Sequence, residues 1–221
     1  MKRSITSIMG VLVLAGALLL AGEARAEHRA RYEVTITNLT RGQVITPPVV
    51  ASHVAGFDLF TLGAPASPEL VALAEDGDFG LLLASLGGQP AVYETVAAAG
   101  PILPGTSVTV EISAPGLFRR ISAVGMLATS NDAFFSVRDV AVPLLGAVTY
   151  EGVAYDAGSE NNSESCAFIP GPPCGNPHVR DTTGAEGFVH VHAGIHGGAD
   201  LVPAQHDWRN PVAQVTIRRV H

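Results

Sequence analysis

The chain has 221 residues, with 13 basic and 20 acidic side chains, a net charge of −7, and 24 glycines and 15 prolines. A composition this low in charge and this rich in turn-forming residues argues against a disordered chain and against a coiled coil. The length is typical of one domain, or of one large β domain with long loops.

The beginning of the sequence predicts export. An uncharged run over 4–22 follows two basic residues, and an Ala-Arg-Ala motif ending at Ala26 places small residues at the two positions that a signal peptidase recognises. We therefore expect a signal peptide over 1–26 and a mature domain over 27–221 in the periplasm or outside the cell. A membrane anchor is the alternative, because 19 uncharged residues are just long enough to span a bilayer, but the cleavage motif favours export. We expect no transmembrane segment in the mature chain.

The expected cleavage has a consequence for charge. It would leave 10 basic and 19 acidic residues, a net charge of −9, with arginine as the only basic residue type. A mature chain without lysine cannot form a lysine Schiff base or a P-loop. Its negative charge argues against nucleic acid as a partner and against a basic patch of the heparin-binding kind.

Alternation and turn residues predict the secondary structure. Strands are expected over 32–37, 106–113, 119–129, 146–155, 187–192 and 212–220, separated by clusters of Gly, Pro, Asn and Asp. Ser67-Pro68-Glu69 is typical of a helix start, with an N-cap followed by proline at the first helical position, and a second short helix is expected from 78 to about 86. These elements predict an all-β sandwich with short helical insertions.

The two cysteines, Cys166 and Cys174, predict one disulfide that closes a small loop, because exported proteins fold in an oxidising compartment. A reactive or metal-binding pair is the alternative. The spacing is not that of a redox Cys-x-x-Cys motif, and export favours the structural bond.

Two acidic segments lie at the expected ends of strands. Asp132 ends the segment Ser-Asn-Asp, and Asp156 and Glu160 bracket the segment Asp-Ala-Gly-Ser-Glu. Carboxylates from two loops at one end of a sandwich, completed by backbone carbonyls and water, are the hard oxygen ligands that calcium requires. The competing interpretation is that these residues cap turns, as Asp and Asn usually do in β loops. Spacing alone leaves both interpretations open.

A family resemblance favours calcium. Ser-Asn-Asp-Ala-Phe-Phe over 130–135 and Tyr-Asp-Ala-Gly-Ser-Glu over 155–160 resemble the paired motifs of the spondin N-terminal domain family. The opening Tyr-Glu-Val-Thr-Ile-Thr-Asn-Leu-Thr and the closing Asn-Pro-Val-Ala-x-Val-Thr-Ile are also similar to the ends of such domains, so the resemblance covers roughly 31–220. It implies a C2-like antiparallel β-sandwich.

The same resemblance implies a ligand set of Asp132, Asp156 and Glu160 for one calcium ion. This sequence departs from the animal members at two places. Asn131 and Ala133 stand where those members have Pro and Trp, and Glu160 stands where they have Asp. The longer side chain of Glu160 can still bind an ion, but its backbone must lie further from it.

Histidines form a second candidate group. His190 and His192 alternate along a predicted strand, so both imidazoles should lie on one side, and His196 follows in the next loop. Imidazoles on one face could bind zinc or copper, or could lie in a hydrogen-bonded loop network. Gly-Phe-Val-His-Val-His also slightly resembles a strand of copper/zinc superoxide dismutase, but there the cysteine follows the first histidine pair, whereas Cys166 and Cys174 precede His190.

No catalytic motif accompanies these groups. The sequence lacks Gly-x-Ser-x-Gly, and a disulfide would leave no free cysteine nucleophile. We therefore expect a non-enzymatic, calcium-binding β-sandwich that acts as a binding or adhesion module toward an extracellular or envelope protein or a glycan. The alternatives are a histidine-based zinc- or copper-binding protein, including a dismutase-like redox protein, and a structural envelope protein.

Overall fold

The computed structural model describes residues 30–220, and the expected signal peptide lies outside this range. In chain order, the elements are β1 (Arg31–Asn38), β2 (Val49–His53), α2 (Pro68–Asp76), α3 (Gly80–Gly87), β3 (Val92–Ala97), β4 (Ser107–Ser113), β5 (Arg120–Met126), β6 (Ala133–Ala141), β7 (Ala147–Asp156), the 3-10 helix η1 (Cys166–Phe168), β8 (His190–Val191), α4 (Pro203–His206) and β9 (Ala213–Arg219). The described part of the chain is therefore mainly β, with a few short helices. No helix within it is long and apolar enough to cross a membrane.

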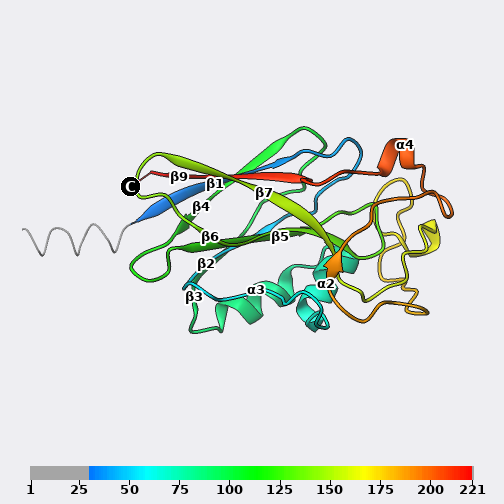
Figure 1. Ribbon diagram of the computed structural model, residues 1–221, viewed down its shortest axis with the longest axis horizontal. Helices are drawn as coiled ribbons and strands as arrows, with labels where there is room; N and C mark the ends of the chain where they lie inside the picture. Colours follow the sequence, from blue (N-terminus) through cyan, green and yellow to red (C-terminus); the bar gives the residue numbers. More distant parts are fainter. Residues whose placement is uncertain (1–29, 221) are drawn as a thin grey trace, which may run out of the picture.

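The strands form one antiparallel sheet in the order β3-β2-β5-β6-β7-β9-β1-β4, with β8 paired to β7. Strand β7 connects two parts of this sheet, because residues 147–152 pair with β9 and residues 153–156 pair with β6. Figure 1 shows the two parts facing each other, with β9, β1 and β4 above β6, β5, β2 and β3. The outer strands meet where Glu94 in β3 accepts a hydrogen bond of 2.7 Å from the backbone N–H of Ser113 in β4. The sheet is thereby nearly closed into a barrel.

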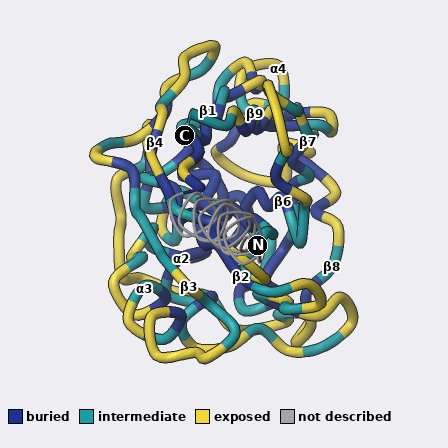
Figure 2. The backbone as a smooth tube through the Cα atoms, turned by 90° about the vertical axis from the view of Figure 1, so that its left-hand side faces the viewer, coloured by how far each residue is buried: buried dark blue, intermediate teal, exposed yellow. Residues whose placement is uncertain are grey.

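The main hydrophobic core fills the space between the two facing parts. Tyr32, Val34 and Ile36 of β1 are fully buried, whereas the residues between them are partly exposed. This is the alternation expected of a strand with one face on the core, and it confirms the prediction for 32–37. The end-on view in Figure 2 shows buried backbone at the centre and exposed backbone around it.

A second, smaller core lies outside the sheet, where α2 and α3 cover one layer. The Ser67 hydroxyl caps α2 by accepting a hydrogen bond from the backbone N–H of Leu70, and Pro68 occupies the first helical position. Leu70 and Leu73 are buried in this second core together with residues of β5 and β6. Both predicted helices are confirmed.

The alternation pattern missed β2, β3 and β6. Every residue of β2 and the first five residues of β6 are buried, so neither strand shows an exposed face. Two predicted strands are also four residues shorter than expected. The strand predicted over 187–192 contains only β8, and the one predicted over 119–129 ends as β5 at Met126.

The predicted disulfide between Cys166 and Cys174 is present, with a Cα–Cα distance of 4.8 Å. It lies in the long segment between β7 and β8. A disulfide in this segment is consistent with folding in an oxidising, exported location.

Candidate metal centre

Strands β6 and β7 place two loops side by side at one end of the sheet, on the right in Figure 1. Ala133, the first residue of β6, pairs with Asp156, the last residue of β7. The start of one antiparallel strand lies beside the end of its neighbour. This register therefore brings Asp132 next to the loop that follows Asp156.

Asp132 is fully buried and joins the two loops. Its Oδ2 accepts hydrogen bonds from the backbone amides of Ser159 (2.8 Å) and Glu160 (3.0 Å) and from the Ser159 hydroxyl (3.2 Å). Its Oδ1 is also buried but has no partner. Burial, with a further contribution from the negative charge of Asp156, raises the pKa of Asp132 to about 7.

Glu160 is also buried, and neither of its carboxylate oxygens receives a hydrogen bond of normal geometry. Burial raises the pKa of Glu160 to about 8, with a further contribution from Asp132 and a smaller, opposite one from the Asn131 amide. Within 30–220, no basic side chain forms an ion pair with either carboxylate. An unpaired buried charge costs several kcal/mol, so these two groups require either protons or a cation.

Asp156 has both carboxylate oxygens engaged. Its Oδ1 accepts a hydrogen bond from the backbone N–H of Gly158 (2.7 Å), and its Oδ2 accepts one from the Asn162 side-chain amide (2.7 Å). The turn requires glycine, because Gly158 has a φ of +66° and a Cβ there would lie 2.3 Å from the Phe188 carbonyl oxygen. The turn at Gly158 therefore fixes the orientation of the Asp156 side chain.

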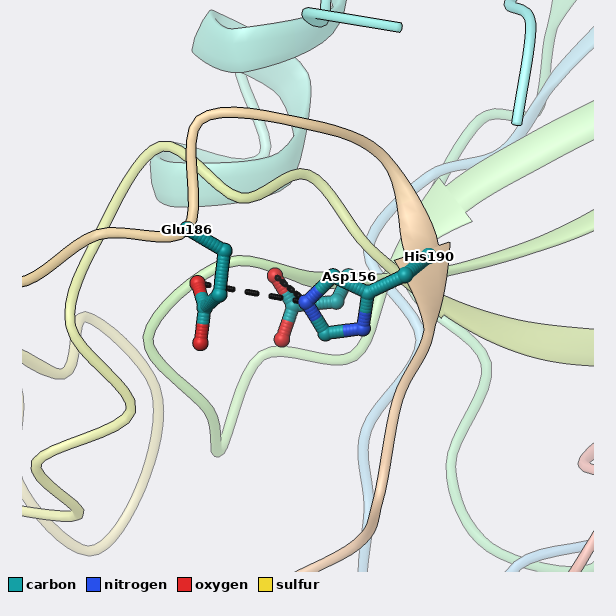
Figure 3. Close-up of side chains that lie close together, drawn as sticks. All are labelled: Asp156, Glu186 and His190. Atoms are coloured by element: carbon teal, nitrogen blue, oxygen red, sulfur yellow. Dashed lines mark ion pairs between the residues drawn. The ribbon is translucent and has the colours of Figure 1, made fainter. Parts of the chain in front are cut away.

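A different set of three residues has its ligand atoms within 4.8 Å of one another: Asp156, Glu186 and His190. Figure 3 shows the three side chains converging from β7, β8 and the loop before β8. His190 Nε2 lies 3.7 Å from Asp156 Oδ1 and 3.9 Å from Glu186 Oε2. Asp156 is buried, His190 is partly buried and Glu186 is exposed. This group could hold a metal ion, and Asp132 and Glu160 are not members of it.

The hydrogen bonds of His190 indicate which ring nitrogen is free. Nδ1 lies 3.1 Å from the carbonyl oxygen of Val191, which can only accept, so Nδ1 carries a proton. Nε2 is buried and has no hydrogen-bond partner. In neutral His190, a lone pair thus faces two carboxylates.

His192 and His196 occupy different environments from His190. His192 Nδ1 accepts a hydrogen bond from the backbone N–H of Gly194 (2.9 Å), and its Nε2 donates to the side-chain oxygen Oδ1 of Asn162 (3.0 Å). Burial lowers the pKa of His192 to about 4, so this ring is neutral at pH 7. His192 Nε2 lies 3.6 Å from Asp156 Oδ2, whereas His196 is exposed. The structure therefore brings two of the three predicted histidines to Asp156.

A pocket of about 230 Å³ opens beside this group. Its lining includes Asn162, Glu164, Glu186, His190, His192 and His196. His190 thus lines this pocket, although its Nε2 is itself buried.

Sequence reasoning did not identify Glu186. The only sequence feature that could have pointed to Glu186 is its position four residues before His190. That spacing places side chains together on a helix, but it carries no such meaning in an irregular loop.

The fold and the site together define an antiparallel β protein with an acidic, histidine-containing group that could hold a metal ion. No protein-family model matches the sequence, and no curated protein matches it. The resemblance to spondin N-terminal domains therefore stays a prediction.

Proposed function

We propose that this protein is an exported, non-enzymatic binding or adhesion module, a C2-like β-sandwich of the spondin N-terminal type whose loop end is stabilised by calcium. The binding surface would be formed by the loops around Asp132, Asp156 and Glu160. Binding residues are commonly found on loops that a rigid scaffold positions.

One observation carries the calcium assignment. Three buried carboxylate oxygens, Asp132 Oδ1 and both oxygens of Glu160, receive no hydrogen bond of normal geometry. Calcium takes six to eight oxygen ligands and accepts carboxylates, carbonyls and water in flexible arrangements. The donor set is therefore of the kind that calcium prefers, and a bound ion would supply the positive charge that these two carboxylates lack.

The surrounding contacts explain how an ion here would affect the loops. Asp132 immediately precedes β6, and the backbone amides that donate hydrogen bonds to it belong to the loop after β7. Neutralising Asp132 and Glu160 together would hold this loop against β6. The loop conformation would then depend on calcium, and so would its affinity for a partner.

Thermal unfolding with calcium and with a chelator tests the calcium site. At a calcium concentration 100 times the Kd, one site contributes about 2.7 kcal/mol, which raises the Tm of a chain of this size by about 5–10 °C. Glu160→Gln should abolish the shift. Glu111→Gln, at a half-exposed position on β4, is the control and should keep it. A wild-type protein with equal Tm in calcium and chelator would exclude the site.

A separate experiment tests the adhesion role. Immobilised mature protein is exposed to envelope extracts and to a glycan array, in calcium and in chelator. A binding module should retain a defined ligand only in calcium, and Glu160→Gln should lose it. Calcium-dependent stability without any retained ligand would favour a structural envelope protein.

A further inference from the structure

Nε2 of His190 lies near two carboxylates but is too far from either to form a hydrogen bond. Its distances to Asp156 Oδ1 and Glu186 Oε2, 3.7 Å and 3.9 Å, exceed the 2.7–3.2 Å range of N–H···O bonds. Two ligand atoms that each lie about 2.0–2.2 Å from a tetrahedral zinc ion are about 3.3–3.6 Å apart. Both distances are slightly wider than this, and the three ligand atoms of the group lie within 4.8 Å of one another. An ion would draw them closer together by moving the exposed Glu186, whose Oε1 accepts a hydrogen bond of 3.3 Å from the Asn162 side-chain amide.

We propose that Asp156, Glu186 and His190 form a transition-metal site, separate from the proposed calcium site and suited to a divalent ion such as zinc. One imidazole nitrogen and two carboxylate oxygens are ligands of zinc, manganese and iron. Calcium, in contrast, takes oxygen ligands. The nitrogen donor is therefore the feature that distinguishes this site from the pair formed by Asp132 and Glu160.

The position of the His190 ring is already set for metal binding. Its Nδ1–H donates to the Val191 carbonyl, which is the outer hydrogen bond that metal-bound histidines commonly make. This bond directs the Nε2 lone pair toward Asp156 and Glu186. Ring orientation therefore requires no rearrangement when an ion binds.

The neighbouring histidines are not ligands in this proposal. Both ring nitrogens of His192 make hydrogen bonds, so ligation would break one of them. His196 is exposed on the rim of the pocket. With three protein ligands, the ion keeps an open position toward the pocket of about 230 Å³, as in zinc sites that bind water or a small ligand.

Asp156 is the only residue that this site shares with the predicted calcium ligands. Glu186 and His190 belong to the transition-metal site alone, and Asp132 and Glu160 belong to the calcium site alone. Single substitutions can therefore separate the two. Glu186→Gln should keep the calcium-dependent rise in Tm, and Glu160→Gln should keep zinc binding.

Calorimetric titration of zinc into the untagged, calcium-saturated mature chain tests the proposal. We expect one zinc ion per chain, at least a tenfold loss of affinity in Glu186→Gln and a larger loss in His190→Ala. His196→Ala is the matched control, with a histidine removed from the same pocket, and should bind zinc as the wild type does. Cobalt titration should give visible absorption bands that His190→Ala lacks.

Three results would overturn the site. They are no zinc binding by the wild type, unchanged binding by His190→Ala, and loss of binding in His196→Ala. If zinc does not bind and nitrogen NMR of His190 shows both ring nitrogens protonated at pH 7, the group is an ion pair between imidazolium and two carboxylates. The calcium-dependent Tm, measured on the same samples, shows whether each variant is folded and whether the calcium site stands independently.

Discussion

The carboxylate of Asp132 accepts a hydrogen bond of 3.0 Å from the backbone amide of Glu160, 28 residues further along the chain. The residue that donates this amide also carries a buried carboxylate without a partner. The contact therefore joins two loops and at the same time brings two negative groups together. The amides favour ionised Asp132, whereas burial and the charge of Asp156 oppose it.

Asp132→Asn separates these effects, because asparagine keeps an acceptor for the two amides and removes the charge. In chelator at pH 8, this variant should be at least as stable as the wild type, and it should gain nothing from calcium. Urea unfolding in both conditions measures this. Asp132→Ala, which removes the acceptor as well, should be about 1–3 kcal/mol less stable than Asp132→Asn in chelator. A calcium response of wild-type size in Asp132→Asn would contradict the assignment.

Gly158→Ala should disrupt the turn that positions Asp156. The new Cβ would meet the Phe188 carbonyl oxygen at 2.3 Å in a left-handed backbone conformation, so both steric overlap and backbone strain destabilise the loop. Gly146→Ala is the control, because Gly146 has a φ of +69° but nothing within 4 Å of its Cβ position. We expect about 1 kcal/mol of destabilisation in Gly146→Ala, from strain alone, and more than about 3 kcal/mol in Gly158→Ala. Urea unfolding measures both values. Equal losses of unfolding free energy in the two variants would show that the loop around Gly158 relaxes to remove the overlap.

His53 is buried in β2 in a neutral form that its hydrogen bonds specify. Its Nδ1–H donates to the Val54 carbonyl oxygen (2.8 Å), and its Nε2 accepts from the Ser122 hydroxyl (2.8 Å). Burial lowers the pKa of His53 below its usual 6.5. A second proton on the ring would remove the acceptor that Ser122 uses.

The pKa of His53 predicts how stability depends on pH. The hydrogen bond to Val54 and the charges of Asp139 and Asp58 raise this pKa, but burial, with a smaller contribution from Arg120, outweighs them. The unfolded chain therefore binds a proton below about pH 6.5 that the folded chain does not, so His53 reduces stability as pH falls below that value. Denaturant unfolding between pH 7 and 5 measures this effect. The free energy of unfolding should fall less steeply with pH in His53→Gln than in the wild type, and as steeply as in the wild type in the control variant His196→Gln. Identical slopes in all three proteins would argue against a neutral His53.

Reduction should destabilise the protein through the Cys166–Cys174 disulfide. The bond closes a loop with a sequence separation of 8. By lowering the conformational entropy of the unfolded chain, it contributes about 2–3 kcal/mol to the free energy of unfolding. Unfolding with and without a thiol reductant should show a lower Tm after reduction. A variant with both cysteines replaced by serine should not respond, and a response in that variant would point to another cause.

Part of this protein follows from local sequence alone. Alternation in 32–37 predicts β1, because one face of that strand packs on the core and the other does not. Ser67 and Pro68 predict the start of α2, because capping depends on neighbouring residues only. Cys166 and Cys174 are the only two cysteines of the sequence, so only one pairing within the chain is possible. The mainly β class, the two insertion helices and the disulfide are therefore readable from the sequence.

Other features were decided by the tertiary structure. Strand β2 is covered on both faces, so it shows no alternation that a sequence pattern could detect. Asp132 and Asp156 meet because β6 and β7 pair in one register. Glu186, and not His196, lies beside His190 and Asp156. The sequence could not predict this, because irregular loops have no repeat from which side-chain directions follow. Strand pairing and loop packing, which depend on contacts between distant residues, thus determine which of the acidic and histidine side chains share a site.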